Sequence, residues 1–307
     1  MSLLEGLSIP ALATLLFVAA FALGVAIQHG TTCAVRAMSE LIRERRADGL
    51  LGFLECGLWA LLVAWLLTPE MAVPQWEPVG WLSLGAALFG AGATMNGGCA
   101  FGSIARLGEG RAEFLLTGAG AYLAFRILEA FGRGRATLPE QSPVPENALF
   151  IVLVGLPLLI AMRFLFWRRP IGVVLKLSLL MAIIGIIGAF VGALHQPWPW
   201  MLALRFIGTS DWLTGLGLVA LVSGSIANGI VRGRFRLARP KLSAVRDRFT
   251  GGMLMGAGSA LVPGGNDSLI LQGIPSGSPL AFVAYGIVLA TIGVLLLPYH
   301  ASTSIEE

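Results

Sequence analysis

Charge is what this sequence has least of. Only 12% of its 307 residues are Asp, Glu, Lys or Arg, and 56% are hydrophobic, whereas soluble domains carry about a quarter charged residues. The mean hydropathy is +0.81. This composition argues against a soluble enzyme and predicts a chain whose solvent is a lipid bilayer.

Cysteine is also scarce. The chain has three cysteines, Cys33, Cys56 and Cys99, and no two of them have the Cys-x-x-Cys spacing of a zinc or redox site. Three cysteines in a membrane protein do not make a disulfide framework. We therefore expect free thiols, no metal site and no cofactor, and each thiol is weighed separately.

Long apolar runs fill the chain. A hydrocarbon core roughly 30 Å thick needs about 20 apolar residues per helix. Nine such runs lie near residues 10–29, 50–68, 80–98, 112–131, 148–167, 172–193, 211–231, 250–271 and 279–298. They are too long and continuous for barrel strands, so helices are expected. The first run follows Glu5 and no basic residue, which favours a retained span over a cleaved signal.

The predicted fold class is therefore all-α integral membrane, a single domain over residues 1–307. Basic loops stay cytoplasmic. With the N-terminus outside, cytoplasmic stretches hold 17 of the 21 basic residues, namely 36–46, 106–111, 163–176 and 232–248. The exceptions are Arg126, Arg133, Arg135 and Arg205. Nine spans then place the C-terminus in the cytoplasm. Without interleaved aromatics, these charges indicate topology and not nucleic-acid binding.

The sequence matches itself at an offset of 166 residues. Gly85-Ala-Ala-Leu-Phe-Gly-Ala-Gly aligns with Gly251-Gly-Met-Leu-Met-Gly-Ala-Gly, and Gly98 aligns with Gly264. We expect two pseudo-symmetric repeat units, residues 1–147 and 148–307. In the predicted topology the first copy runs inward and the second outward, so the units would be inverted, as in many transporters.

Both copies end in residues that interrupt a helix, Asn96-Gly-Gly-Cys99 and Pro263-Gly-Gly-Asn-Asp267. Broken or re-entrant half-helices are tolerated at membrane depth only where their backbone lines a cavity or is buried in protein. A cavity is therefore expected near Cys99 and Gly265. The alternative is that the glycines only allow close helix packing, but packing does not require Cys99, Asn266 or Asp267.

Two motifs carry a resemblance to a known family. They are His29-Gly-Thr-Thr-Cys33-Ala-Val-Arg36, and Gly97-Gly-Cys99-Ala-Phe-Gly-Ser103 continuing to Arg106-Leu-Gly-Glu109-Gly110. They resemble the YeeE/YedE family. The resemblance implies a bacterial inner-membrane importer of thiosulfate or a related sulfur compound, hourglass-shaped, in which cysteine thiols on a central path contact the substrate transiently. It also implies a small cytoplasmic sulfur-carrier protein as partner.

Carried over by motif, Cys33 and Cys99 match the first two path thiols. The third family motif, Leu-Ala-Gly-Gly-Cys-Asn, reads Leu261-Val-Pro-Gly-Gly265-Asn266 here, so glycine stands at the third cysteine position. Asp267 replaces an apolar residue beside it. The predicted substrate path therefore consists of Cys33, Gly98, Cys99, Gly264, Gly265, Asn266 and Asp267.

Two interpretations of Asp267 stay open. One is a neutral carboxyl that donates a hydrogen bond or takes up a coupling proton, and the other is a cap on a half-helix. Because the third thiol is missing, the substrate could also differ from that of the family, for example another sulfur or selenium oxyanion or a neutral thiol compound.

Other residues carry weaker expectations. Arg106 and Glu109 are three positions apart, which predicts an ion pair at a cytoplasmic exit or at a docking site for the carrier protein, or simply a fixed loop. His29 is placed on one helical face with Cys33. It is expected to be a structural histidine, and a role in proton transfer is the alternative. Cys56 matches no family position and is expected to pack. A belt of interfacial tryptophans is expected at Trp198, Trp200 and Trp212.

Two other classes of function compete with transport. A membrane-embedded sulfur-handling enzyme could use Cys99 as its nucleophile, but the sequence places no base beside that residue. A non-transporting scaffold or sensor stays open because the third thiol is missing. We expect a transporter and not an enzyme.

Overall fold

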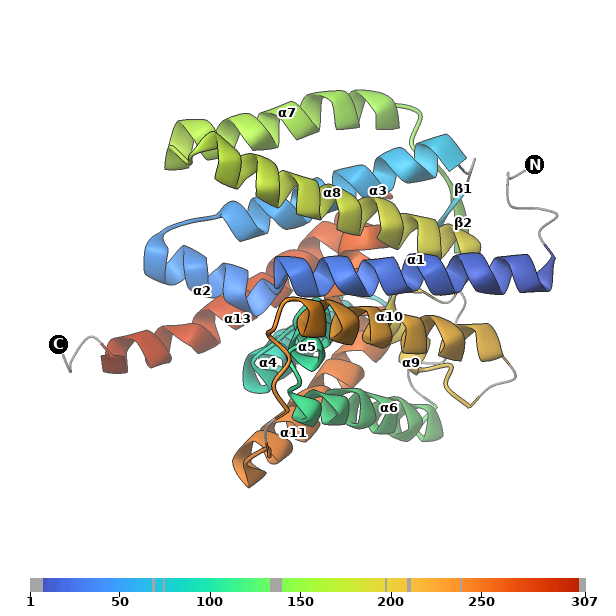
Figure 1. The fold of residues 1–307 in the computed structure, drawn as a ribbon, viewed down its shortest axis with the longest axis vertical. Helices are drawn as coiled ribbons and strands as arrows, with labels where there is room; N and C mark the ends of the chain where they lie inside the picture. The colour runs from blue at the N-terminus through green and yellow to red at the C-terminus, as the bar shows by residue number, and fades with distance from the viewer. Residues whose placement is uncertain are drawn as a thin grey trace.

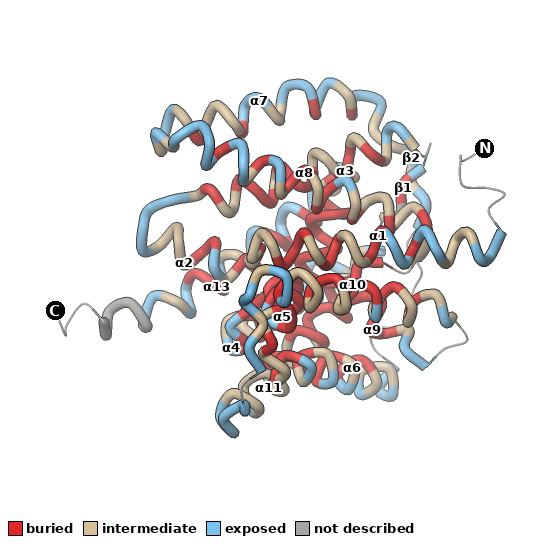
Figure 2. Tube along the Cα trace, viewed as in Figure 1, coloured by how far each residue is buried: buried red, intermediate tan, exposed pale blue. Residues whose placement is uncertain are grey.

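The computed structural model describes residues 8–67, 70–73, 75–132, 140–196, 198–208, 211–237 and 239–303. Helices gather around a buried centre, and the most exposed positions lie on the outer helices (Figures 1 and 2). Arg133 and Arg135, which were assigned to an outer loop, lie outside the described residues.

Long helices match the predicted spans. They are α1 (Ile9–Gly30), α3 (Asp48–Leu67), α4 (Val79–Asn96), α6 (Leu115–Ala130), α7 (Ala148–Trp167), α8 (Ile171–Leu194), α10 (Trp212–Val231), α11 (Leu242–Leu261) and α13 (Pro279–Thr303). Within the described residues, six segments are long and apolar enough to cross a membrane. They contain α1, α3, α7, α8, α10 and α13. The chain is thus a multi-pass, all-α membrane protein, and nine spans stay a prediction.

One predicted span has the wrong limits. The run 250–271 was expected as one span with an interruption at residues 263–265, whereas α11 begins at Leu242 and ends at Leu261. It ends there because Pro263, Gly264 and Gly265 follow, and neither proline nor consecutive glycines propagate a helix.

Short helices follow the interruptions. They are α2 (Ala34–Glu44), α5 (Ala100–Gly108), the 3₁₀ turn η1 (Ala112–Phe114), α9 (Trp200–Leu204), α12 (Asn266–Ser268) and the π-helical turn η2 (Leu269–Gly273). The interruptions before α5 and α12 are those expected from sequence. The one before α2 was not expected: α1 ends at Gly30 and Thr31 has a φ of 47°. His29 and Cys33 therefore do not share a helical face, and that expectation is wrong.

The 166-residue offset extends beyond the matching sequence. It carries α1 onto α8, α2 onto α9, α3 onto α10, α4 onto α11, α5 onto α12 with η2, and α6 onto α13, which leaves α7 unmatched. Packing repeats in the same way, because α1 contacts α10 as α8 contacts α3, and α6 contacts α11 as α13 contacts α4. At their closest approach, α4 and α11 are antiparallel, with Gly85 against Gly258 and Gly92 against Gly251.

A short antiparallel ribbon joins β1 (Glu70–Val73) to β2 (Glu140–Pro143), with Glu70 opposite Pro143. No strand was expected from the sequence. The ribbon ties the segment after α3 to the segment before α7, so it holds together two connections that lie at the same end of these helices (Figure 1).

Helix α7 lies at the edge of the bundle (Figure 1) and is fastened by a buried ion pair. Arg163 Nη1 lies 2.6 Å from Glu55 Oε2 on α3 and 2.8 Å from Ser178 Oγ on α8. Arg163 is 0% exposed and Glu55 1%. Arg163 was assigned to a cytoplasmic loop, and this is wrong because partners on two neighbouring helices accommodate its charge within α7.

Candidate functional site

Cys33 and Cys99 lie together at the starts of two half-helices. Cys33 precedes α2 and Cys99 precedes α5, both with extended backbones. The Ala34 N–H donates to Cys99 Sγ at 3.1 Å, and the Cys99 N–H donates to Cys33 Sγ at 3.4 Å. The two cysteines matched by motif are therefore neighbours in space, and both are free thiols.

Glycine at position 102 makes this approach possible. A Cβ on Gly102 would lie 2.6 Å from Cys33 Sγ, closer than side chains pack. Glycine therefore lets α5 run directly past the first thiol. Cys99 is completely buried by this packing, while Cys33 keeps part of its surface exposed.

Asn96 holds the loop that carries Cys99. Its Nδ2 donates to the Gly98 carbonyl at 2.7 Å and lies 2.9 Å from Ser103 Oγ, while its Oδ1 accepts from Thr117 Oγ1 at 2.7 Å. Asn96, Ser103 and Thr117 are all 0% exposed. The amide thus replaces the helical hydrogen bonds that the chain loses at the interruption. This role of Asn96 is not among those expected from the sequence.

The second interruption has a different construction. Gly264 and Gly265 have φ values of 83° and 76°, and residues other than glycine rarely adopt the Gly265 conformation (ψ −154°). A Cβ at position 265 would also overlap the ring of Phe89, which is completely buried on α4. The place of the third family thiol is therefore taken by an aromatic ring from the other half of the chain.

Asn266 and Asp267 connect the two interruptions. The Ala100 N–H donates to Asn266 Oδ1 at 3.3 Å, and the Met201 N–H donates to Asp267 Oδ2 at 3.3 Å. Both side chains are 0% exposed. Hydrogen bonds thus run across the centre from α2 to α5, from α5 to α12 and from α12 to α9. Predicted path residues from both parts of the chain, Cys33 and Cys99 from the first and Asn266 and Asp267 from the second, therefore lie in one hydrogen-bonded centre.

The electrostatics of this centre favour negative charge. The first backbone N–H groups of a helix lack intrahelical partners and carry a partial positive charge. At the starts of α2 and α5 these groups point at sulfur and at an amide oxygen, which are weak or neutral acceptors. A small anion is a better acceptor for such groups than either.

The predicted exit lies at the far end of α5. Arg106 Nη1 lies 3.0 Å from Glu109 Oε2, so the expected ion pair is present. Arg106 is also near other basic groups: Arg248 stacks on the Phe114 ring with 4.6 Å between the guanidinium carbon and the ring centroid, and Arg111 lies over the same ring at 5.3 Å. A nine-residue helix is about 13 Å long, so this is the distance from the thiols to the basic end.

The opposite side of the centre differs from expectation. Trp198 and Trp200 are only 3% and 5% exposed, so they do not form an interfacial belt, although Trp212 is exposed. The Trp198 carbonyl accepts from Gln272 Nε2 at 2.8 Å, which explains why this segment is held inside. Glu129 pairs with Arg126, three positions before it, and also with Arg205, at 2.9 and 3.2 Å.

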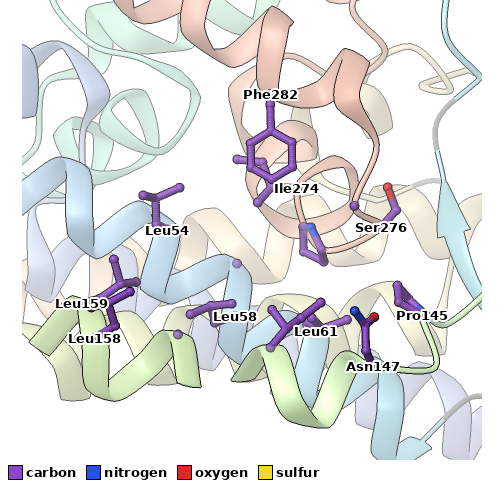
Figure 3. A pocket seen from close by; sticks show the side chains of 15 residues that line it. Leu54, Leu58, Leu61, Pro145, Asn147, Leu158, Leu159, Ile274, Ser276 and Phe282 are labelled. Atoms are coloured by element: carbon purple, nitrogen blue, oxygen red, sulfur yellow. The ribbon is translucent and has the colours of Figure 1, made fainter. Parts of the chain in front are cut away.

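A pocket of ≈ 640 Å³ lies away from the thiols. It is bounded by α3, α7 and the segment that leads into α13, and Figure 3 shows its apolar side chains, with Asn147 and Ser276 near one end. No predicted path residue lines it. The side chains of Cys99, Asn266 and Asp267 are instead completely buried, and a cavity beside them stays a prediction. Cys56 is 1% exposed, in keeping with packing.

Broken helices that bring free thiols and the N–H groups of half-helix starts to a common centre are typical of membrane transporters. The family model described as sulphur transport matches residues 29–218 and again residues 167–296. The chain therefore belongs to the sulphur transport family, which confirms the YeeE/YedE resemblance. A search of curated proteins found no match.

Proposed function

We propose that this chain imports thiosulfate or a related small sulfur anion across the bacterial inner membrane, through a central path at Cys33 and Cys99. The observation that carries the proposal is the reciprocal hydrogen bonding of these two free thiols at the starts of α2 and α5. Gly98, Gly264, Gly265, Asn266 and Asp267 border the same path.

The thiols serve as replaceable acceptors. Without substrate, the two sulfurs accept hydrogen bonds from the N–H groups of Ala34 and Cys99. A sulfur is a weak acceptor and a soft, polarizable surface, so an incoming anion takes these N–H groups over and the freed S–H groups turn to donate to it. No covalent bond is needed. Weak contacts in series permit release as well as entry.

The proposed topology has two inverted units and nine spans, with the N-terminus outside and the C-terminus in the cytoplasm. The 166-residue offset and the antiparallel contact of α4 with α11 support the inversion. The basic residues on one side support the orientation. The units were drawn as residues 1–147 and 148–307, and the element order makes α7 the connection between them.

Arg106 and Glu109 border the proposed cytoplasmic exit. Together with Arg111 and Arg248 they present a basic surface, which favours an anion leaving the path and an acidic sulfur-carrier protein that collects it. An enzymatic role for Cys99 has less support, because its described side-chain hydrogen bond is to the Ala34 N–H and to no histidine or carboxylate.

Growth on thiosulfate tests the function. A bacterial host without its own thiosulfate importers is given this chain, with and without a sulfur-carrier protein, and protein in the membrane is measured in parallel. We expect wild type and Cys56→Ala to support growth and Cys99→Ala not to. Both cysteines are buried, so Cys56→Ala controls for the loss of a buried thiol. Equal growth of both variants would contradict the thiol path.

A further inference from the structure

The first turns of the corresponding short helices α2 and α9 donate to different acceptors. In the first half the Ala34 N–H, at the start of α2, donates to Cys99 Sγ at 3.1 Å. In the second half the Met201 N–H, in the first turn of α9, donates to Asp267 Oδ2 at 3.3 Å. A carboxyl group thus accepts from the start of α9, whereas a thiol accepts from the start of α2. At neutral pH an ordinary thiol is neutral, whereas an ordinary carboxyl is negatively charged unless it binds a proton.

The second oxygen of this carboxyl is unsatisfied. Asp267 is 0% exposed, and its Oδ1 has no hydrogen-bond partner among the described residues. The neighbouring Asn266 Nδ2, equally buried, also has none. Buried polar atoms without partners are rare, and each calls for an explanation such as an absent ligand. A proton on Oδ1 converts this acceptor into an O–H group.

The surroundings suit a proton better than a metal cation. Sodium and calcium need several oxygen ligands, whereas the group that contacts Asp267 Oδ2 is an N–H donor, which a cation would repel. Within the part of the chain that the structure describes, no cluster of three His, Cys, Asp or Glu side chains is placed to hold a metal ion.

Charged groups on the adjoining elements are engaged elsewhere. Helix α12 contacts η2, α9 and α5. The segment 266–273 carries no other titratable side chain. On α5 these groups are Cys99, which accepts from Ala34, and Arg106, which pairs with Glu109. Arg205, directly after α9, pairs with Glu129. Among the described residues, no basic side chain forms an ion pair with Asp267, so a negative charge on this carboxyl would have no compensating partner.

We propose that Asp267 binds a proton that enters together with the substrate anion. This rests on the proposed function. A proton from the outer compartment binds Oδ1 and the carboxylate becomes a neutral acid, so the anion passes a neutral group instead of a negative one. The acid releases the same proton on the cytoplasmic side. One proton and one anion thus move inward in each cycle, and no bond of the substrate breaks.

Proteoliposomes test the proposal. The purified full chain is reconstituted, the membrane potential is clamped with valinomycin and equal potassium, and radiolabelled thiosulfate is followed with and without a lumen one pH unit more alkaline. One coupled proton raises the accumulation ratio roughly tenfold per pH unit. We expect this rise in wild type and in Asp247→Asn, whose side chain is on the surface and pairs with Arg246. We expect no rise in Asp267→Asn, and the comparison uses the accumulation ratio at equilibrium, which does not depend on how fast the variant moves thiosulfate.

The outcomes separate the two ideas. A wild-type protein that equilibrates thiosulfate without responding to the gradient overturns the inference and leaves the function standing. So does an Asp267→Asn variant that still responds tenfold. If Asp267→Asn does not fold, pyranine in the lumen of wild-type vesicles decides the matter, because thiosulfate entry without a proton refutes coupling. A wild type that moves no thiosulfate refutes the function, and the inference falls with it.

Discussion

Cys99 Sγ accepts a hydrogen bond from the first residue of the half-helix that Cys33 begins, and Cys33 Sγ accepts one from the Cys99 N–H. Each sulfur therefore accepts a hydrogen bond from the backbone of the segment that carries the other cysteine. This arrangement makes both sulfurs part of one unit, so the three cysteines of the chain should differ in a way that can be measured.

Thiol labelling should separate the cysteines. Cys33 is partly exposed, whereas Cys99 and Cys56 are 0% and 1% exposed. We expect a small maleimide to modify Cys33 first in the folded protein and the other two only after denaturation, as resolved by peptide mass spectrometry. Thiosulfate should slow the modification of Cys33 if it occupies the path. Labelling of Cys56 as fast as that of Cys33 would contradict the described packing.

Restoring a cysteine at position 265 should not restore a family-like site. The backbone there has a φ of 76°, and a Cβ would overlap Phe89. We expect Gly265→Cys and Gly265→Ala alike to destabilise the protein by about 1–3 kcal/mol, seen as a lower Tm in detergent. Gly286→Ala is the control, because a Cβ there meets nothing within 4 Å. Adding Phe89→Leu to Gly265→Cys should recover part of the loss.

Breaking the buried ion pair should be costly. Arg163 and Glu55 are 0% and 1% exposed, and removal of one partner leaves an unpaired buried charge, which costs about 3–5 kcal/mol. We expect Glu55→Gln to lower the Tm strongly and Glu55→Leu with Arg163→Leu to lower it less. Glu40→Gln, which breaks the more exposed pair with Arg36, serves as control. A double variant as unstable as the single one would argue against charge burial as the cause.

Loss of the Asn96 side chain should lower stability and thiosulfate uptake more than loss of the Thr117 hydroxyl. Asn96→Ala leaves the Gly98 carbonyl, Ser103 Oγ and Thr117 Oγ1 without this partner. Because a buried group that loses its partner costs about 1–3 kcal/mol, we expect a clear fall in Tm together with loss of thiosulfate uptake. Thr117→Val removes only one of these bonds and should keep most uptake. Equal uptake by wild type and Asn96→Ala would show that the loop does not depend on this amide.

The helix interruptions that could be predicted from the sequence are those that contain consecutive glycines or a proline. Residues 97–98 and 263–265 contain such runs, and both are interruptions in the structure. The interruption before α2 contains Thr31 and Thr32, which do not forbid a helix locally. The turn at Thr31 is left-handed, and the two helices that it separates contact different partners, α1 against α10 and α2 against α13. The 166-residue offset contained a usable signal, because it places Cys33 opposite Pro199, directly before α9.

Contacts between distant residues were beyond local patterns. Arg163 is close in sequence to Arg168 and Arg169, so its charge indicated a loop, and only the approach of Glu55 and Ser178 explains its burial. The bond from Ala100 to Asn266 joins positions 166 residues apart. The repeat made their relation plausible, but the identity of the bonded atoms depends on the packing of four half-helices.

The Arg163–Glu55 pair has a consequence for how the chain enters the membrane. An arginine within an isolated membrane helix opposes insertion, by up to about 2.5–3.5 kcal/mol at the helix centre, and Arg163 lies four residues before the end of α7. Synthesis runs from the N-terminus, so α3 with Glu55 is delivered before α7 with Arg163, and the acceptor is in place when the cation arrives. Helix α7 can therefore pair with a helix that is already in the membrane. The order of synthesis thus lowers the free-energy cost of inserting Arg163.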